Sequence, residues 1–119
     1  MIWFEWKESG MTVRELTSDE YDDVVRDNRF VVVKYWAAWC PPCRAFTPIF
    51  EKVSAERPDI VFASVDVDRE TIVSARNNVA SIPTVIMYRD GEQVNRLTGA
   101  VSQKDFTSIL NDTFGVRTA

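Results

Sequence analysis

One stretch of the chain constrains the fold more than any other: an apolar run that is followed at once by the only two cysteines. Phe30–Trp36 consists of β-branched and aromatic residues, except for Lys34. A continuous apolar run of this length is typical of a strand buried on both faces, as in a parallel sheet covered by helices. Cys40 and Cys43 follow, and an amphipathic segment begins there. The stretch therefore predicts a buried strand that leads into a helix at the cysteine pair.

The segments on either side of this stretch predict further strands and helices. Thr12–Leu16 is predicted to be a short strand. Thr17 and Glu20 have the spacing of a capping box, so a helix is expected to begin there and to end near residue 28. After the cysteines, apolar residues recur at helical spacing and predict a helix from about Pro41 to about Arg57.

The middle of the chain predicts a second buried strand and a short helix. Ile60–Val67 is another apolar run. Asp68 follows it and is expected to cap a short helix that carries Ile72, Val73 and Ala75. Strands that alternate with helices in this way favour parallel pairing.

The last third of the chain predicts a hairpin and a final helix. Asp90-Gly91 is a strong signal for a two-residue turn, so the apolar run over residues 85–88 and Glu92–Thr98 are expected to pair antiparallel. Ser102 begins a last amphipathic helix, and Gly115 ends it. The element order is β-α-β-α-β-α-β-β-α, which predicts an α/β fold with a mixed sheet.

The length of 119 residues suits one domain with one core. We assign residues 12–119 to this domain and residues 1–11 to an N-terminal extension. The extension contains Trp3, Phe4 and Trp6 without a clear period. Two interpretations stay open for it: an appendage without a role, or a segment whose aromatic side chains pack on the domain or on a partner.

Composition excludes several classes of function. The net charge of −4 and the scattered basic residues argue against nucleic acid as a partner. No apolar run approaches the roughly 20 residues that span a bilayer, and Met1–Glu8 is too short and too charged for a signal peptide, so we expect a cytoplasmic protein. The chain has no histidine, which excludes imidazole acid–base chemistry and imidazole metal ligands.

The position of the cysteines predicts redox chemistry. The first turn of a helix has unpaired N–H groups and partial positive charge, so a thiolate at Cys40 is stabilised and its pKa should fall. Cys43 lies one turn further on, close enough to form a disulfide with Cys40. Pro41 and Pro42 suit the first turn but have no N–H groups, which leaves the N–H of Cys43 as the main donor to the Cys40 sulfur.

Three other interpretations of the cysteine pair are weaker. A structural disulfide that closes so short a loop removes little unfolded-state entropy. A zinc site needs four ligands, and without histidine the chain could supply them only by sharing a site between two copies. Two inert core cysteines do not suit a helix start with two prolines. We therefore expect a redox-active dithiol and no bound metal.

The chain resembles the thioredoxin family over roughly residues 12–114. The resembling segments, in order, are Val31–Arg44, Pro48, Val65–Asp68, Ile82–Thr84, Asp90–Glu92 and Gly99-Ala100. The resemblance implies a thioredoxin fold, which is a five-stranded mixed sheet flanked by four helices. It also implies a monomer that reduces protein disulfides without a bound cofactor and receives electrons from an NADPH-dependent thioredoxin reductase.

The resemblance also implies roles for individual residues. Cys40 is expected to be the exposed nucleophile and Cys43 the buried resolving thiol, with the Ile82–Pro83 peptide bond in cis beside them. A flat apolar patch would receive the substrate strand. Its expected members are Trp39, Pro41, Ile82, Pro83, Gly99 and Ala100, and Pro42 and Arg44 are expected to support the cysteines. Two other functions stay open: a disulfide carrier or mild oxidant, and a binding subunit whose thiols are dispensable.

Lys34 departs from the family pattern, which has a buried acid at this position beneath the resolving cysteine. Three alternatives stay open: its ammonium reaches water, it pairs with an acid such as Asp66, or it is buried and deprotonated and acts as a base. In the first two, its charge and that of Arg44 favour both thiolates, and stabilised thiolates raise the reduction potential. We therefore hypothesise a more oxidising protein than an ordinary thioredoxin.

Overall fold

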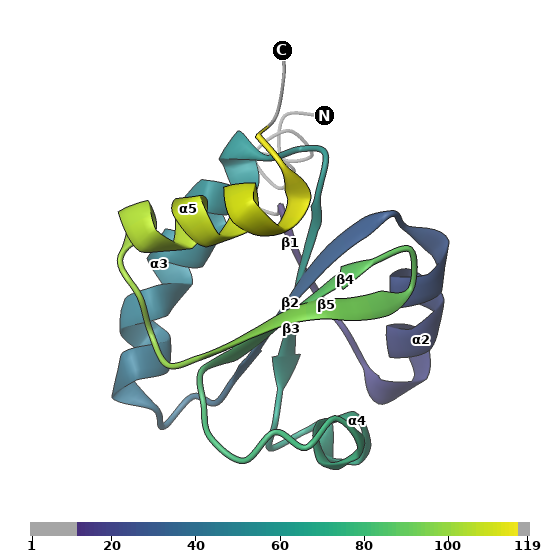
Figure 1. The fold of residues 1–119 in the computed structure, drawn as a ribbon. Helices are drawn as coiled ribbons and strands as arrows, with labels where there is room; N and C mark the ends of the chain where they lie inside the picture. The colour runs from purple at the N-terminus through teal and green to yellow at the C-terminus, as the bar shows by residue number, and fades with distance from the viewer. Residues whose placement is uncertain (1–11, 117–119) are drawn as a thin grey trace, which may run out of the picture.

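A computed structural model of the chain describes residues 12–116 (Figure 1). The expectations for the N-terminal extension, residues 1–11, lie outside the described residues. The elements are β1 (Val13–Glu15), α2 (Ser18–Asp27), β2 (Phe30–Trp36), α3 (Pro41–Glu56), β3 (Val61–Asp66), α4 (Thr71–Arg76), β4 (Thr84–Arg89), β5 (Glu92–Thr98) and α5 (Gln103–Phe114). Their order is the one predicted, and their bounds differ from the expected ones by a few residues at most.

The strands form one five-stranded sheet in the order β1-β3-β2-β4-β5. β1, β3 and β2 run parallel, and the β4–β5 hairpin pairs antiparallel with β2. At the centre, Val33 of β2 lies opposite Ala63 of β3 and Ile86 of β4. Helices α3 and α5 cover one face of the sheet, and α2 and α4 cover the other (Figure 1). Within residues 12–116, the predicted mixed sheet and its four helices are confirmed.

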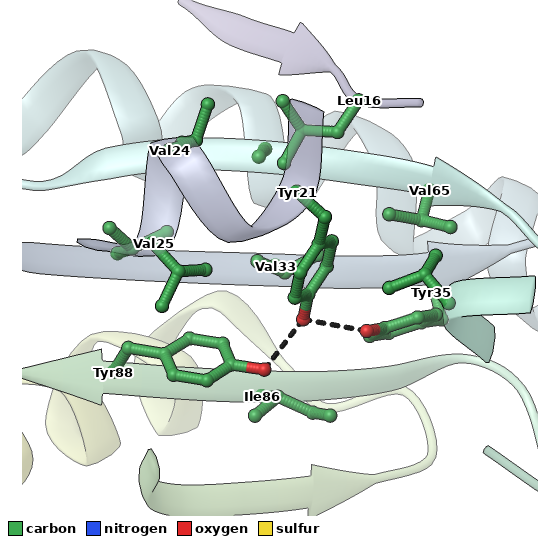
Figure 2. Packing of buried hydrophobic residues seen from close by; sticks show 12 residues of the cluster. Leu16, Tyr21, Val24, Val25, Val33, Tyr35, Val65, Ile86 and Tyr88 are labelled. Carbon is green, nitrogen blue, oxygen red and sulfur yellow. Dashed lines mark hydrogen bonds between the residues drawn. The ribbon is translucent and has the colours of Figure 1, made fainter. Parts of the chain in front are cut away.

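The buried strand β2 contributes side chains to two hydrophobic cores, because successive side chains point to opposite faces of the sheet. Val31, Val33 and Tyr35 pack with residues of α2 and α4 (Figure 2), whereas Val32 packs with phenylalanines of α3 and α5. All four are fully buried. Each fully buried aliphatic side chain contributes about 1.5–3 kcal/mol, which explains why a strand covered on both faces reads as an unbroken apolar run.

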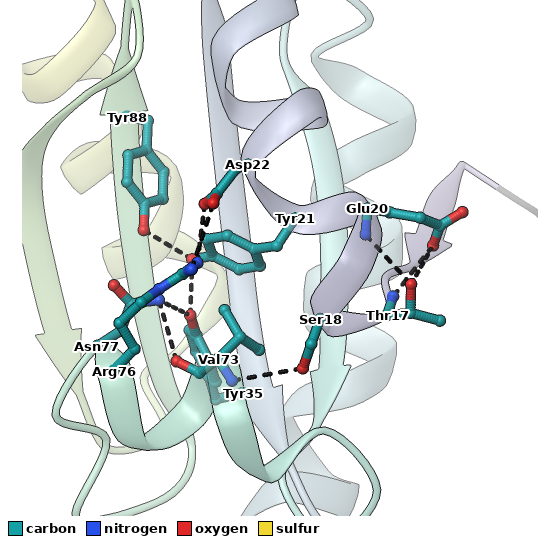
Figure 3. A network of polar contacts seen from close by, with 10 residues as sticks. All are labelled: Thr17, Ser18, Glu20, Tyr21, Asp22, Tyr35, Val73, Arg76, Asn77 and Tyr88. Atoms are coloured by element: carbon teal, nitrogen blue, oxygen red, sulfur yellow. Dashed lines mark hydrogen bonds and ion pairs between the residues drawn. The ribbon is translucent and has the colours of Figure 1, made fainter.

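Three local signals act as expected. Thr17 accepts from the N–H of Glu20 at 3.2 Å, and the Glu20 carboxylate accepts from the N–H of Thr17 at 3.0 Å, which is the predicted capping box (Figure 3). Ser102 accepts from the N–H of Asp105 and caps α5 in the same way. Asp90 and Gly91 both have positive φ, the backbone conformation that a two-residue hairpin turn requires.

The prediction for α4 is wrong at its start. Glu70, not Asp68, is the N-cap residue, and it makes no capping hydrogen bond of its own. The N–H of Val73 instead donates to the Ser18 hydroxyl of α2 (Figure 3), and the N–H of Ser18 donates to the Glu70 carboxylate. Ile72 is 72% exposed rather than part of the core. A cap supplied from another helix cannot be read from the local sequence.

A network of tyrosine hydroxyls joins α2 to the sheet. The Tyr35 hydroxyl donates to Tyr21 at 2.6 Å, Tyr21 and Tyr88 lie 2.6 Å apart at their oxygens, and Asn77 donates to Tyr35 at 3.1 Å (Figures 2 and 3). The three rings are almost completely buried. Helix α2, the central strand β2 and strand β4 are therefore linked through one chain of hydrogen bonds.

Candidate functional site

Cys40 and Cys43 lie at the start of α3 and are joined by a disulfide, with their Cα atoms 5.2 Å apart. Cys40 is the N-cap residue, and Pro41 and Pro42 occupy the first two helical positions. The N–H of Cys43 donates to the Cys40 sulfur at 3.2 Å. This is the donor expected from the sequence, because the prolines have no N–H group to offer. The helix start and this N–H together form a site that stabilises negative charge on the Cys40 sulfur.

The expectation that Cys40 is exposed is wrong for this disulfide form. Cys40 is 3% exposed and Cys43 is completely buried. The two cysteines pack with Ala37, and the half-buried side chains of Trp36 and Ile82 close over this small cluster. Of the two residues, Cys40 retains slightly more exposed surface.

The loop before β4 faces the disulfide. The Ile82–Pro83 peptide bond is cis, as the family resemblance implied, and the Ile82 carbonyl oxygen lies 3.8 Å from the Cys40 sulfur. The N–H of Gly99, which has φ of 96°, donates to the Pro83 carbonyl oxygen at 2.8 Å. The structure thus brings the segments around residues 82 and 99 together beside the cysteines.

The other residues expected in the apolar patch differ in exposure. Trp39 is 65% exposed, Pro41 and Ala100 are exposed, and Pro83 is buried. The Trp39 indole N–H donates to the Asp68 carboxylate at 2.8 Å, which ties the ring to the chain that follows β3. This role of Asp68 was not predicted, because its carboxylate was expected to cap a helix.

Arg44 lies on the exposed face of α3, one residue after Cys43. Its guanidinium donates to the Ala38 carbonyl oxygen at 3.1 Å, in the loop that precedes Cys40. The hydrogen bond places a positive group against this loop.

Lys34 is 3% exposed, so the alternative in which its ammonium reaches water is wrong. Its Nζ donates to the Thr47 hydroxyl at 2.9 Å and lies 5.1 Å from the centre of the Phe50 ring. The alternative of an ion pair with Asp66 is also wrong, because the Asp66 carboxylate accepts from the N–H of Asp68 and forms no ion pair with Lys34. The Thr47 hydroxyl of α3 is the hydrogen-bond partner instead of the acid that this alternative named.

Burial lowers the pKa of Lys34 to about 8, although the carboxylates of Glu51 and Glu15 act in the opposite direction. A group with this pKa is largely an ammonium at pH 7, so Lys34 fits neither a free surface lysine nor a fully deprotonated base. The burial that the third alternative expected is confirmed, and the lowered pKa brings the loss of the Lys34 proton close to neutral pH.

An open cavity of about 380 Å³ lies beside Lys34, between α3 and the β1 side of the sheet. Its lining residues are Val13, Glu15, Lys34, Trp36, Thr47, Glu51 and Ser64. The indole N–H of Trp36 is buried and has no hydrogen-bond partner among the described residues. Thr47 and Glu51 were not predicted as neighbours of Lys34. Their spacing was a usable signal, because residues four and eight positions after Cys43 lie on one face of a helix.

Residues 12–116 contain no group of three or more Cys, His, Asp or Glu side chains that could hold a metal ion. The helices of the same residues are too short or too polar to span a bilayer.

Comparisons with known proteins agree with this geometry. A family model described as Thioredoxin matches residues 12–112. Putative thioredoxin 2 from Streptomyces coelicolor is 35% identical over 81% of this chain and 72% of its own length. A bifunctional thioredoxin reductase/thioredoxin from Mycobacterium leprae is 33% identical over 89% of this chain and 23% of its own. The solved thioredoxin from Plasmodium falciparum superimposes with a TM-score of 0.79 at 31% identity, covering 83% of this chain and 97% of that one. The family match extends from β1 into α5 and therefore includes every residue of the site.

Proposed function

Because the chain belongs to the thioredoxin family and joins its two cysteines in a disulfide at the start of α3, we propose that Cys40 attacks protein disulfides and Cys43 releases the product. The protein is a thiol–disulfide oxidoreductase of the protein-disulfide reductase type. The observation that carries the proposed roles is the hydrogen bond from the N–H of Cys43 to the Cys40 sulfur.

The reaction begins with the reduced pair. The Cys40 thiolate, stabilised by the helix start, attacks one sulfur of the substrate disulfide. A bond forms between Cys40 and that sulfur, and the second substrate sulfur leaves as a thiolate that takes a proton from solvent. Cys43 then loses its proton and attacks the Cys40 sulfur. The mixed disulfide breaks, the second substrate thiol is released, and two electrons have passed from the cysteine pair to the substrate.

The surface around Cys40 supports a protein as the substrate. Trp39 and Pro41 flank Cys40 in the chain and are exposed. The Ile82 carbonyl oxygen lies 3.8 Å from the Cys40 sulfur, and Gly99 is hydrogen-bonded to the adjacent Pro83. We propose that an extended substrate segment lies across this surface, with its sulfur placed against Cys40. Pro83 contributes from behind the surface through its contact with Gly99 rather than through its own exposed area.

Regeneration of the dithiol requires an external electron donor. We propose a thioredoxin reductase that uses NADPH, and the relative from Mycobacterium leprae, whose name joins a reductase and a thioredoxin in one chain, supports this pairing. The chain itself needs no bound cofactor in this cycle, because the two sulfurs carry the electrons. We also propose that the protein acts as a monomer in a reducing compartment such as the cytoplasm.

The experiment is NADPH-coupled reduction of insulin with a thioredoxin reductase. We expect turnover with the wild-type chain and none with Cys40→Ser or Cys43→Ser. Insulin reduction that survives Cys40→Ser would overturn the assignment of the nucleophile. Failure of the wild-type chain to turn over with several reductases would overturn the reductive cycle.

A second candidate, a mild oxidant, is favoured by one observation, the ammonium of Lys34 connected to Cys43 through Thr47. A cation near the thiolates stabilises the reduced form and raises the reduction potential. Equilibration with glutathione decides between the two candidates. If the protein is a mild oxidant, its reduction potential should be lower in Lys34→Asp than in wild type. An unchanged or higher reduction potential in that variant would refute this candidate.

A further inference from the structure

Lys34 and Cys43 are connected by two hydrogen bonds through one side chain. The Lys34 ammonium donates to the Thr47 hydroxyl at 2.9 Å, and the same hydroxyl donates to the Cys43 carbonyl oxygen at 3.0 Å. Thr47 lies one helical turn after Cys43, so helix geometry alone places its hydroxyl on that carbonyl. A buried positive charge therefore lies two hydrogen bonds from the backbone of the resolving cysteine.

The carboxylates that face Lys34 come from the two elements that line its cavity. Glu51 belongs to α3 and Glu15 to β1, and neither forms an ion pair with the ammonium. The remaining polar groups around it, the Ser64 hydroxyl and the Trp36 indole, are neutral. The charge of Lys34 is thus neither neutralised by contact nor screened by full exposure to water.

We propose that Lys34, acting through Thr47, is a positioning residue for the resolving step, because its ammonium stabilises the Cys43 thiolate that attacks the mixed disulfide. This inference rests on the proposed function, since it requires Cys43 to be the resolving thiol. A unit charge several Å from a partly buried thiolate shifts its pKa by about one unit, which changes the thiolate fraction on the order of tenfold. The influence ends when Lys34 loses its proton, and its lowered pKa of about 8 places that loss just above neutral pH.

The proton and electron balance of the step does not involve Lys34 directly. Cys43 gives its proton to solvent and its thiolate attacks the Cys40 sulfur. The bond between Cys40 and the substrate sulfur breaks, and the substrate leaves with the electron pair and takes a proton from solvent. Lys34 keeps its proton throughout and acts through its charge, which the hydrogen bond to Thr47 holds in place near Cys43.

The test separates the two steps with 5,5′-dithiobis(2-nitrobenzoate) as the probe and the reduced full-length chain. Attack by Cys40 releases the first thionitrobenzoate, and resolution by Cys43 releases the second, so stopped-flow absorbance records both rates. We expect Lys34→Met and Thr47→Val to slow the second release on the order of tenfold at pH 7 while the first release changes less. Thr47→Ser keeps the hydroxyl and should restore the wild-type rate.

Two further comparisons distinguish a charge effect from a structural one. The exposed Lys52 lies on the same helix, so Lys52→Met, which removes the same charge, should leave both rates as in wild type. The double variant Lys34→Met/Thr47→Val should be no slower than Lys34→Met, because both changes interrupt one connection. The wild-type pH profile of the second release should have an inflection near pH 8 that Lys34→Met lacks.

The outcomes separate this inference from the proposed function. Equal second-release rates and pH profiles in wild type and Lys34→Met would overturn the role of Lys34 and leave the proposed function intact. Additive effects of the two substitutions would overturn the path through Thr47. The absence of a second release from the wild-type chain would instead overturn the role of Cys43 as the resolving thiol.

Discussion

Replacing Tyr21 with phenylalanine removes one oxygen atom from the centre of the buried tyrosine network. That oxygen accepts from the Tyr35 hydroxyl and lies 2.6 Å from the Tyr88 hydroxyl, so the substitution removes two hydrogen bonds. Each contributes about 0.5–1.5 kcal/mol net, and the Tyr35 proton left without an acceptor adds about 1–3 kcal/mol. The ring contacts of Tyr21, with centroids 6.2 Å from Tyr35 and 6.1 Å from Tyr88, remain. We therefore expect the free energy of unfolding to fall by about 3 kcal/mol.

Tyr88→Phe is the matched control. It removes only the bond at the end of the network, so its cost should be about 1 kcal/mol smaller than that of Tyr21→Phe. The double variant should cost less than the sum of the two, because the bond between Tyr21 and Tyr88 is lost in both single variants.

Urea unfolding of the oxidised protein measures these differences, with tryptophan fluorescence and circular dichroism as two probes whose transitions should coincide. No tryptophan is altered, so the fluorescence signal is the same in every variant. A Tyr21→Phe protein within about 0.5 kcal/mol of wild type would refute the reasoning, and so would a larger loss in Tyr88→Phe than in Tyr21→Phe.

Three other substitutions test separate parts of the structure. Ser102→Ala removes the N-cap of α5 and should lower the free energy of unfolding by about 1 kcal/mol, whereas Ser102→Asp keeps a capping oxygen and should restore it. Equal urea midpoints for Ser102→Ala and wild type would contradict the stabilising role of the cap. The pKa of Lys34 is about 8 in the fold, whereas its ordinary value is 10.5. Between these two pH values the unfolded chain binds more protons than the folded chain, so the free energy of unfolding should rise as pH increases from 8. Lys34→Met should flatten that rise between about pH 8 and 10.5, and equal slopes would contradict the burial of a charged lysine. Asp68→Ala frees the Trp39 indole and should raise KM for insulin about threefold at unchanged stability, and an unchanged KM would show that the indole needs no partner.

The sequence was sufficient for most of the fold because the decisive signals are local. A serine at a helix start, such as Ser102, and the Asp90-Gly91 pair act through the backbone of their immediate neighbours, so their effect can be read without knowing the tertiary structure. The almost continuous apolar composition of Phe30–Trp36 is enough to predict a strand that is buried on both faces of the sheet. These features were enough to place the cysteines at the start of a helix beside a central strand.

Contacts between distant segments could not be predicted. The start of α4 depends on Ser18, 55 residues before the N–H that it caps, so the nearer Asp68 was assigned to the wrong role. The environment of Lys34 depends on α3, which supplies Thr47 as its partner, and none of the three alternatives drawn from the sequence included that residue. Cys40 is buried because the chain around Ile82 closes over it, and that contact spans 42 residues.

The central claim is that Cys40 is the thiolate nucleophile and Cys43 the thiol that resolves. Alkylation of the reduced chain with iodoacetamide, followed from about pH 4 to pH 10 by mass spectrometry, tests it most directly. We predict that Cys40 is labelled first, with a pKa below the roughly 8.5 of a free thiol, and that Cys43 reacts only at much higher pH. Equal labelling of the two cysteines, or labelling of Cys43 first, would contradict the account.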